Sequence, residues 1–281
     1  MLRTASLAVA VLLVMSSMGV ADDEDIALRK YHPWGRAQLG AWNRVRIVTE
    51  TVNDQGSTVS ASTTDTKSTL VERGLESYAL RLETTVEVAG KRILSQPQIV
   101  RLGYAGENLG EQLSYRSMDD ASLSIDGRKI NCSVQEVEIV GAGQKLLSLV
   151  RYADSVAPFV LHRKTTQTDL VRPTQSQDTE FEVVALDMPF RIRGITHNTA
   201  HTKQVQRGPH GTTVTLSVVS ADVPGELVSQ TSKKLDDKGR VIRRSSLELV
   251  GYYSAPAPDA EALGEVRVPR RYHKRPRHER R

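Results

Sequence analysis

The stretch "YALRLETTVEV" at residues 78–88 decides the fold class. Its even-numbered positions are Tyr, Leu, Leu, Thr, Val and Val, whereas its odd-numbered positions are Ala, Arg, Glu, Thr and Glu. Alternation with a period of two is typical of an antiparallel strand with one buried face and one solvated face. At about 3.3 Å per residue such a strand is about 36 Å long, which favours a large curved sheet over a small sandwich.

The same alternation predicts further strands, and glycine-containing turns join them. The strands are "SVQEVEI" (133–139), "TEFEVVAL" (179–186) and "TTVTLSVV" (212–219). The turns are "NDQG" (53–56), "VAGKRI" (88–93), "IDGRKI" (125–130) and "DDKG" (236–239). Turns of this composition favour hairpins. We therefore expect a mainly β protein, with a large curved antiparallel sheet that forms a half-barrel or open barrel.

One or two short helices are also expected. Residues 21–30, "ADDEDIALRK", carry acidic residues before basic ones, as the helix dipole prefers. A second helix is predicted within 105–122.

Two stretches about 67 residues apart share a skeleton of Ala-Asp, Val and Pro. They are "YADSVAPFVLHRKT" (152–165) and "SADVPGELVSQT" (220–231), and each is followed by a strand, a turn and another strand. Because proline removes a backbone donor, Pro158 and Pro224 are expected to mark where long strands begin. The pattern predicts a strand–Pro-turn–hairpin unit used repeatedly in one sheet. A structural joint is the favoured role, and direct ligand contact is the alternative.

The N-terminus has the features of a secretory signal peptide at residues 1–21. Arg3 precedes an apolar run at 5–14, and Gly19 and Ala21 fit the small positions before a cleavage site. The run is too short to cross a bilayer, so no transmembrane segment is expected in the mature chain. The protein is predicted to be exported, either periplasmic or extracellular, with residues 22–253 forming a single β-rich domain.

Residues 254–281 are predicted to be a disordered tail, Pro/Ala-rich at first and then basic. Residues 266–281 carry +7 and Arg3 adds +1, so residues 22–265 hold −3 of the chain's total of +5. We expect the tail to contact an anionic surface of the cell envelope, with a solvated solubility tail as the alternative. No nucleic-acid partner is expected. The surface-binding residues would be Arg267, Arg270, Arg271, Lys274, Arg275, Arg277, Arg280 and Arg281.

No motif of catalysis, cofactor binding or phosphate binding is found, so we expect no catalytic, cofactor-binding or metal-binding residue, and no enzyme. "GAGQK" (141–145) is interpreted as a turn between strands. His197 and His201 could share a metal on a helix, but on the predicted strand their rings are about 13 Å apart. Cys132, the one cysteine, is interpreted as a small buried hydrophobe, with a catalytic thiol as the alternative.

Two tryptophans, Trp34 and Trp42, flank a Gly-containing turn near the start of the sheet region. Exposed aromatic rings could stack on sugars. The favoured interpretation instead places Trp42 as a plug in one end of the sheet's core.

The segments "HPWGRAQLGAWNRVRIVTET" (32–51) and "VALDMPFRI" (184–192) resemble uncharacterised exported proteins of planctomycete-type bacteria. The Pro-containing elements resemble a recurrent joint of exported bacterial β-sheet proteins. In architecture, the chain is similar to periplasmic lipoprotein-carrier and lipid-binding half-barrels. The first resemblance implies no catalytic residue, and the last implies a curved sheet around an apolar hollow.

Two functions remain open. The first is a non-enzymatic binding or carrier module for an apolar or amphiphilic ligand, such as a lipid, with the tail contacting an anionic surface. The alternative is a structural or interaction protein of the cell envelope with no small-molecule ligand. A hydrolase is a distant third, because it needs a spatial arrangement of residues that sequence does not reveal.

Overall fold

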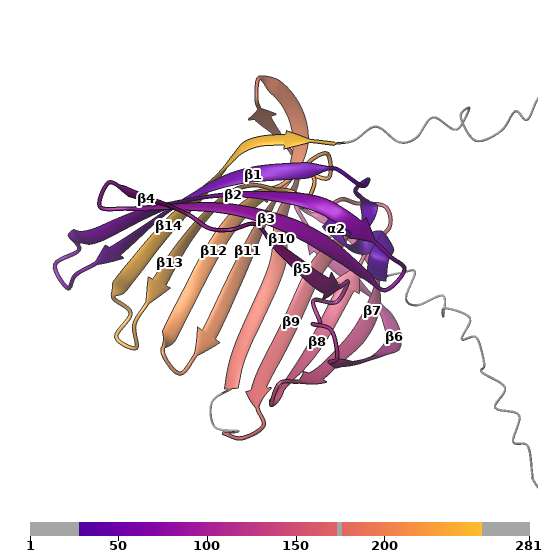
Figure 1. Ribbon diagram of the computed structural model, residues 1–281. Coiled ribbons are helices and arrows are strands. Elements are labelled where there is room, and N and C mark those ends of the chain that lie inside the picture. Colours follow the sequence, from indigo (N-terminus) through magenta and orange to yellow (C-terminus); the bar gives the residue numbers. More distant parts are fainter. Residues whose placement is uncertain (1–27, 173–175, 255–281) are drawn as a thin grey trace, which may run out of the picture.

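One antiparallel sheet of fourteen strands forms most of the protein (Figure 1). The computed structural model describes residues 28–172 and 176–254. The sheet curves strongly but does not close, because β4 lies at one edge of the strand order and β6 at the other. The predicted fold class, a large curved antiparallel sheet with few helices, is confirmed.

The elements follow one another along the chain with short connections. They are α2 (Pro33–Arg36), β1 (Trp42–Val52), β2 (Thr58–Arg73), β3 (Ser77–Val88), β4 (Lys91–Leu94), β5 (Gln98–Gly103), β6 (Gln112–Ile125), β7 (Arg128–Gly141), β8 (Gln144–Tyr152), β9 (Val160–Asp169), β10 (Ser176–Ile192), β11 (Ile195–Gly208), β12 (Gly211–Val219), β13 (Leu227–Leu235) and β14 (Val241–Tyr253).

Most neighbours in the sheet are consecutive hairpins, and two connections set the overall shape. The first strand, β1, pairs with the last, β14, so the two ends of the strand region lie side by side. At the edge, β5 pairs with β3, and the chain then passes through residues 104–111 to β6 at the opposite edge. The chain therefore bridges the two edges of the sheet.

The predicted polar turns have the expected hydrogen bonds. The Asn53 side chain accepts a hydrogen bond from the Ser57 N–H at 2.9 Å, between β1 and β2. The Asp236 side chain accepts one from the Arg240 N–H at 2.8 Å, between β13 and β14. Such Asx turns satisfy backbone donors where the chain reverses. The turn at 141–145 joins β7 to β8, as predicted.

The predicted helix within 105–122 is wrong, because this stretch runs into β6, which pairs with β7. Met118 pairs with Val134 and Ala121 with Cys132, so a β-bulge puts one extra residue into β6. An extra residue turns all following side chains to the other face of the sheet. The alternation that identifies a strand is therefore broken in the middle of this one.

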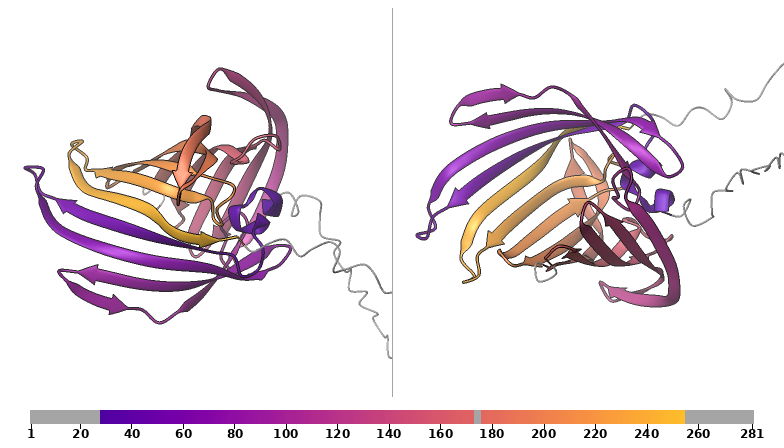
Figure 2. Two further views of the ribbon diagram at one scale, coloured as in Figure 1. Left: turned by 90° about the horizontal axis from the view of Figure 1, so that it is seen from above. Right: turned by 60° about the horizontal axis from the view of Figure 1, so that its bottom comes forward.

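Short helical turns precede the first strand. Residues 28–31 are helical and α2 follows them, whereas residues 21–27 of the predicted first helix lie outside the described residues. Both views in Figure 2 place this helical segment at one end of the curved sheet. The predicted signal peptide (1–21) also lies outside the described residues, as does the tail beyond Ser254.

Candidate functional site

The two Pro-containing stretches form equivalent loops between strands. The Ala153 N–H donates to the Phe159 carbonyl at 2.9 Å, between β8 and β9. The Ser220 N–H donates to the Glu226 carbonyl at 2.8 Å, between β12 and β13. Each bond joins residues six positions apart, so the loops have the same size. A strand follows each proline as predicted, since β9 begins at Val160 and β13 at Leu227, but these strands have 10 and 9 residues and are not the long strands that were expected.

The first Pro loop holds the N-terminal helical segment against the sheet. The Arg36 guanidinium lies over the Phe159 ring, 4.3 Å from its centroid, and the Tyr31 ring is 6.3 Å from the same ring. Lys30 forms an ion pair with Asp154 at 2.8 Å. The aromatic and cation–π contacts fix the segment from one side.

The second Pro loop holds the same segment from another side. Arg36 forms an ion pair with Glu226, whose pKa is raised by burial and lowered less by the guanidinium. The same loop is also held to the sheet, because the amide of Asn43, in β1, donates to the Pro224 carbonyl at 2.7 Å. Gly225 lies so close to Trp34 that a Cβ would sit 2.9 Å from the indole ring. The two Pro loops together anchor the helical segment, which is a structural role, and Pro158, Gly225 and Glu226 of the same stretches also line the hollow described below, so the alternative of ligand contact stays open.

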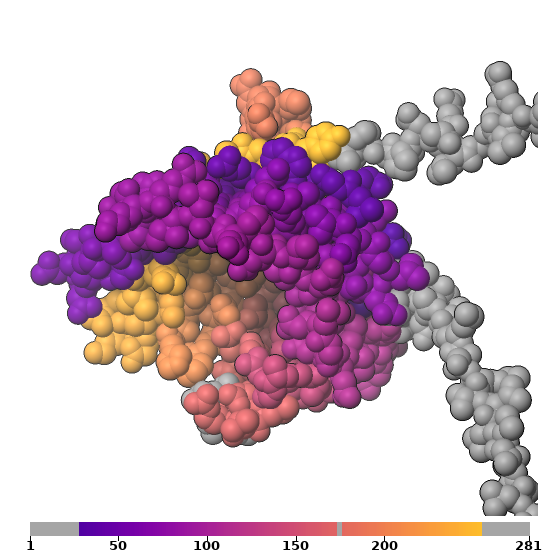
Figure 3. All heavy atoms as spheres, viewed as in Figure 1, coloured from indigo at the N-terminus to yellow at the C-terminus, as the bar shows by residue number. Residues whose placement is uncertain are grey.

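The curved sheet encloses an open hollow of about 570 Å³ (Figure 3). Its walls come from β7 to β13, from the helical segment and from residues near the end of β5. Aliphatic and aromatic side chains form one part of the lining: Ile139, Leu146, Val160, Phe181, Val219 and Leu227. Hydroxyl and amide side chains form another part: Ser148, Thr165, Gln167, Thr179, Thr202, Gln204 and Ser217.

The polar lining follows the strand register in rows. Thr165 of β9 pairs with Ser148 of β8 and with Thr179 of β10. The Ser148 and Thr165 hydroxyls are 2.8 Å apart and share a hydrogen bond. The interior is therefore amphiphilic, which differs from the mostly apolar hollow that the similarity to half-barrels implies.

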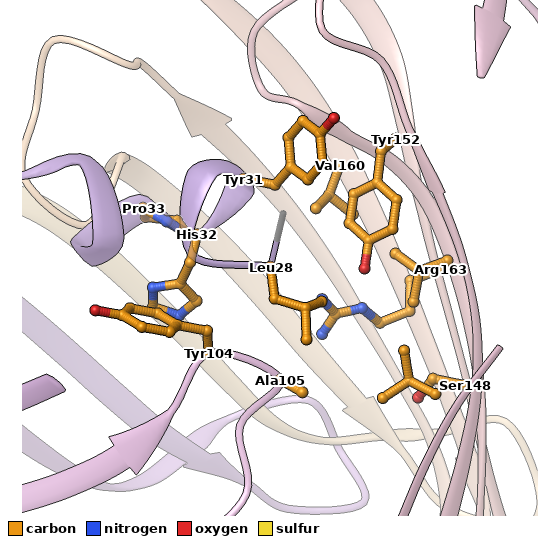
Figure 4. A pocket seen from close by; sticks show the side chains of 12 residues that line it. Leu28, Tyr31, His32, Pro33, Tyr104, Ala105, Ser148, Tyr152, Val160 and Arg163 are labelled. Atoms are coloured by element: carbon orange, nitrogen blue, oxygen red, sulfur yellow. The ribbon is translucent and has the colours of Figure 1, made fainter. Parts of the chain in front are cut away.

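The helical segment closes one end of the hollow (Figure 4). The His32 ring packs 4.7 Å from the Tyr78 ring and 5.5 Å from the Tyr104 ring. Its Nδ1 accepts a hydrogen bond from the Trp34 N–H at 3.2 Å. Burial lowers the pKa of His32 to about 4, with Arg163 and Arg36 adding to the effect, so this ring is neutral at pH 7.

Arg163 projects from β9 into the closed end, beside Leu28 and Tyr152 (Figure 4). Burial lowers the pKa of its guanidinium, opposed by the nearby Tyr152. Sequence reasoning missed both Arg163 and His32. The sequence does contain a signal for Arg163. In "RKTTQ" (163–167) every second side chain faces the same side of the strand, so Arg163 lies on the inward face together with Thr165 and Gln167.

The histidine pair lies on a strand, as predicted. His197 and His201 both belong to β11, where they pair with Phe190 and Ala185 of β10. His197 Nδ1 is 2.8 Å from Asp222 Oδ2, so its nearest ionisable partner is a carboxylate in the second Pro loop. No cluster of three or more potential metal ligands occurs in the described parts of the chain.

The interpretation of Cys132 as a small buried hydrophobe is consistent with the structure. Its side chain packs with Leu161 and Val183, and burial raises the pKa of the thiol. The placement of Trp42 as a core plug is wrong. Trp34 is the buried tryptophan, at 8% exposure, whereas the register puts Trp42 on the charged outer face, where Lys67 lies 4.8 Å from its ring.

The eight basic residues predicted to bind a surface all lie outside the described residues: Arg267, Arg270, Arg271, Lys274, Arg275, Arg277, Arg280 and Arg281. Within the described residues, no helix is long and apolar enough to span a membrane.

Comparison with known proteins finds matches among solved structures alone. No family model matches the sequence, and neither does any curated protein. A candidate lipoprotein from Parabacteroides distasonis is similar at 11% identity and a TM-score of 0.30, over 79% of this chain and 98% of that one.

Two further solved structures have similar values. A candidate exported protein with a YmcC-like fold from Bacteroides fragilis is 9% identical at a TM-score of 0.27, over 77% of this chain and 97% of that one. A mutant porin of Rh. blastica is 9% identical at a TM-score of 0.30, over 75% and 99%. At these TM-scores the likeness carries no argument about function, and the resemblance to planctomycete-type proteins stays a prediction.

Proposed function

We propose that the protein is an exported, non-enzymatic binding or carrier module whose hollow holds an amphiphilic ligand. The observation that carries the proposal is the hollow of about 570 Å³, which is open to solvent and lined by both apolar and hydroxyl side chains. Cavities of this size that combine an apolar lining with a few polar groups are typical of small-molecule sites.

The helical segment supports this proposal, because it forms a preformed wall at one end of the hollow. Two Pro loops and the ion pair of Arg36 with Glu226 hold the segment in place. A preformed wall lowers the ordering cost of binding. In this proposal, the basic tail keeps the protein at an anionic surface of the envelope, in the periplasm or outside the cell.

Mass spectrometry of organic extracts from protein purified out of its native envelope tests the function. We expect an amphiphilic compound in stoichiometric amount. Protein denatured and washed before extraction serves as the control, because it has lost the hollow. A folded protein that carries no ligand and binds none on addition of envelope extract would contradict the proposal.

The second candidate, an interaction protein of the envelope, rests on the edge strand β4. Ile93 and Leu94 in this strand are 59% and 73% exposed. Unpaired edges with apolar side chains are templates for pairing with another chain. Copurification of a partner that Ile93→Lys abolishes, together with an empty hollow, would favour this candidate.

A further inference from the structure

Of the charged side chains around the hollow, one has a counter-ion and the other has none among the described residues. Two charged side chains line the hollow, those of Arg163 and Glu226, because His32 is neutral at pH 7. Glu226 is neutralised by its ion pair with Arg36. Arg163 has no ion pair in the described part of the chain, and its Nε is buried without a hydrogen-bond partner there. Arg163 is half-buried, and a cation that is partly removed from water without a counter-ion is costly, so natural proteins keep one rarely and usually for function.

The surroundings of Arg163 leave room for a small polar group. A partly open space of about 50 Å³ lies at this end of the hollow, between Arg163, Val160, Ser148 and the helical segment. This volume exceeds the ~10–15 Å³ that a single water needs. In Figure 4 the Tyr152 hydroxyl points toward the Arg163 side chain, which adds a second donor.

The guanidinium of Arg163 determines which chemical group of a ligand would bind there. Its planar fork matches the two oxygens of a carboxylate or phosphate and cannot accept a hydrogen bond. Because Arg163 is half-buried, the attraction is screened less there than at the open surface. Phe181, the partner of Arg163 on β10, lies beside the guanidinium's strand position. The next row along β9 is the hydroxyl row of Ser148, Thr165 and Thr179, and the apolar Leu146 and Ile139 follow it, since Leu146 pairs with Gln167 and with Ile139.

We propose, resting on the proposed function, that Arg163 binds the anionic group of the ligand, a carboxylate or phosphate, at the closed end of the hollow. The rest of the ligand then passes Phe181 and the hydroxyl row of Ser148, Thr165 and Thr179, and its apolar part reaches Leu146 and Ile139 toward the open side.

Titration calorimetry with matched probes tests this assignment. The probes are decanoate, decyl phosphate and decanol, which share one chain and differ in the head. We expect wild-type protein to bind an anionic probe about ten- to hundredfold tighter than decanol, as a charged hydrogen-bonded pair provides. Arg163→Gln should remove that preference, so that the anionic probes bind no tighter than decanol. The two anionic probes distinguish carboxylate from phosphate.

Lys164→Gln is the matched control, because it removes the same charge from the next residue of β9, which is exposed and does not line the hollow. It should keep the preference for the anionic probe. Arg163→Lys keeps the charge without the fork and should retain part of the preference. Far-UV circular dichroism verifies that each variant is folded.

The outcomes separate the two proposals. If wild type and Arg163→Gln bind all three probes equally, the hollow binds apolar chains but the assignment of Arg163 is wrong. If Lys164→Gln loses the preference as Arg163→Gln does, general charge is responsible and the assignment is again wrong. If wild type binds none of the probes, the assignment is overturned, and extraction of a ligand from native protein decides the proposed function separately.

Discussion

Gly225 provides a sharp test of how the helical segment is anchored. Its φ of +75° lies in the left-handed region, and an added Cβ would sit 2.9 Å from both the Trp34 ring and the Asn43 amide nitrogen. Gly239, in the turn after β13, has a φ of +77°, and its added Cβ would have no neighbour within 4 Å. Substitution by alanine therefore strains both backbones equally but crowds the packing at Gly225 alone.

The expected losses of stability differ accordingly. Gly239→Ala should lower the free energy of unfolding by about 1–2 kcal/mol, the cost of an L-residue in the left-handed region. Gly225→Ala should lower it by a further ~1–3 kcal/mol, the usual cost of overpacking a core. Urea unfolding followed by circular dichroism measures both values. Tryptophan emission should move to longer wavelength in Gly225→Ala, because Trp34 becomes more exposed.

A double-mutant cycle isolates the contact. In a Trp34→Ala background, the extra cost of Gly225→Ala over Gly239→Ala should become smaller, since the Trp34 ring is gone and the Asn43 amide is the neighbour that remains. Equal losses for the two glycine variants in the wild-type background would refute the reasoning, because Trp34 would then not pack against the second Pro loop.

Three further predictions concern charges. His32 has a pKa of about 4 in the folded protein and 6.5 in the unfolded chain, so the folded state loses about 3 kcal/mol of stability as the pH falls from 6.5 to 4. His32→Asn, which keeps a capping acceptor, should remove this dependence of the unfolding free energy on pH, and urea unfolding at several pH values measures it. Arg163→Met should raise the free energy of unfolding of ligand-free protein by about 1–3 kcal/mol, because it removes an unpaired charge, whereas Lys164→Met should change it little. A lower free energy of unfolding in Arg163→Met would contradict this, because the arginine would then stabilise the folded protein. Asp236→Ala should lower the melting temperature more than Asp237→Ala, because the Asp236 side chain accepts backbone hydrogen bonds in its turn; equal shifts would contradict this.

The strands and turns were predictable because they follow local rules. The alternation at 78–88 and the Asx turn at 236–239 depend on neighbouring residues only, and both are present in the structure. The bulge in β6 was not predictable. Leu113 and Leu123 are both odd-numbered, so simple alternation puts them on one face, yet they pack into two different clusters.

The site was less predictable than the fold, because its parts come from distant segments. Arg163 becomes unusual only when Leu28, Val160 and the helical segment enclose it. The same "LHRKT" in a flat, solvated sheet would present an ordinary surface arginine. The difference between Trp34 and Trp42 has a similar origin, since the second Pro loop buries one of them from about 190 residues farther along the chain.

The rows of hydroxyl groups in the hollow have a thermodynamic consequence. Ser148, Thr165 and Thr179 present hydroxyl groups to an open hollow, so a ligand that covers them buries polar as well as apolar surface. Burying polar surface changes the heat capacity in the opposite direction to burying apolar surface. Binding in this hollow should therefore show a small heat-capacity change for the area covered.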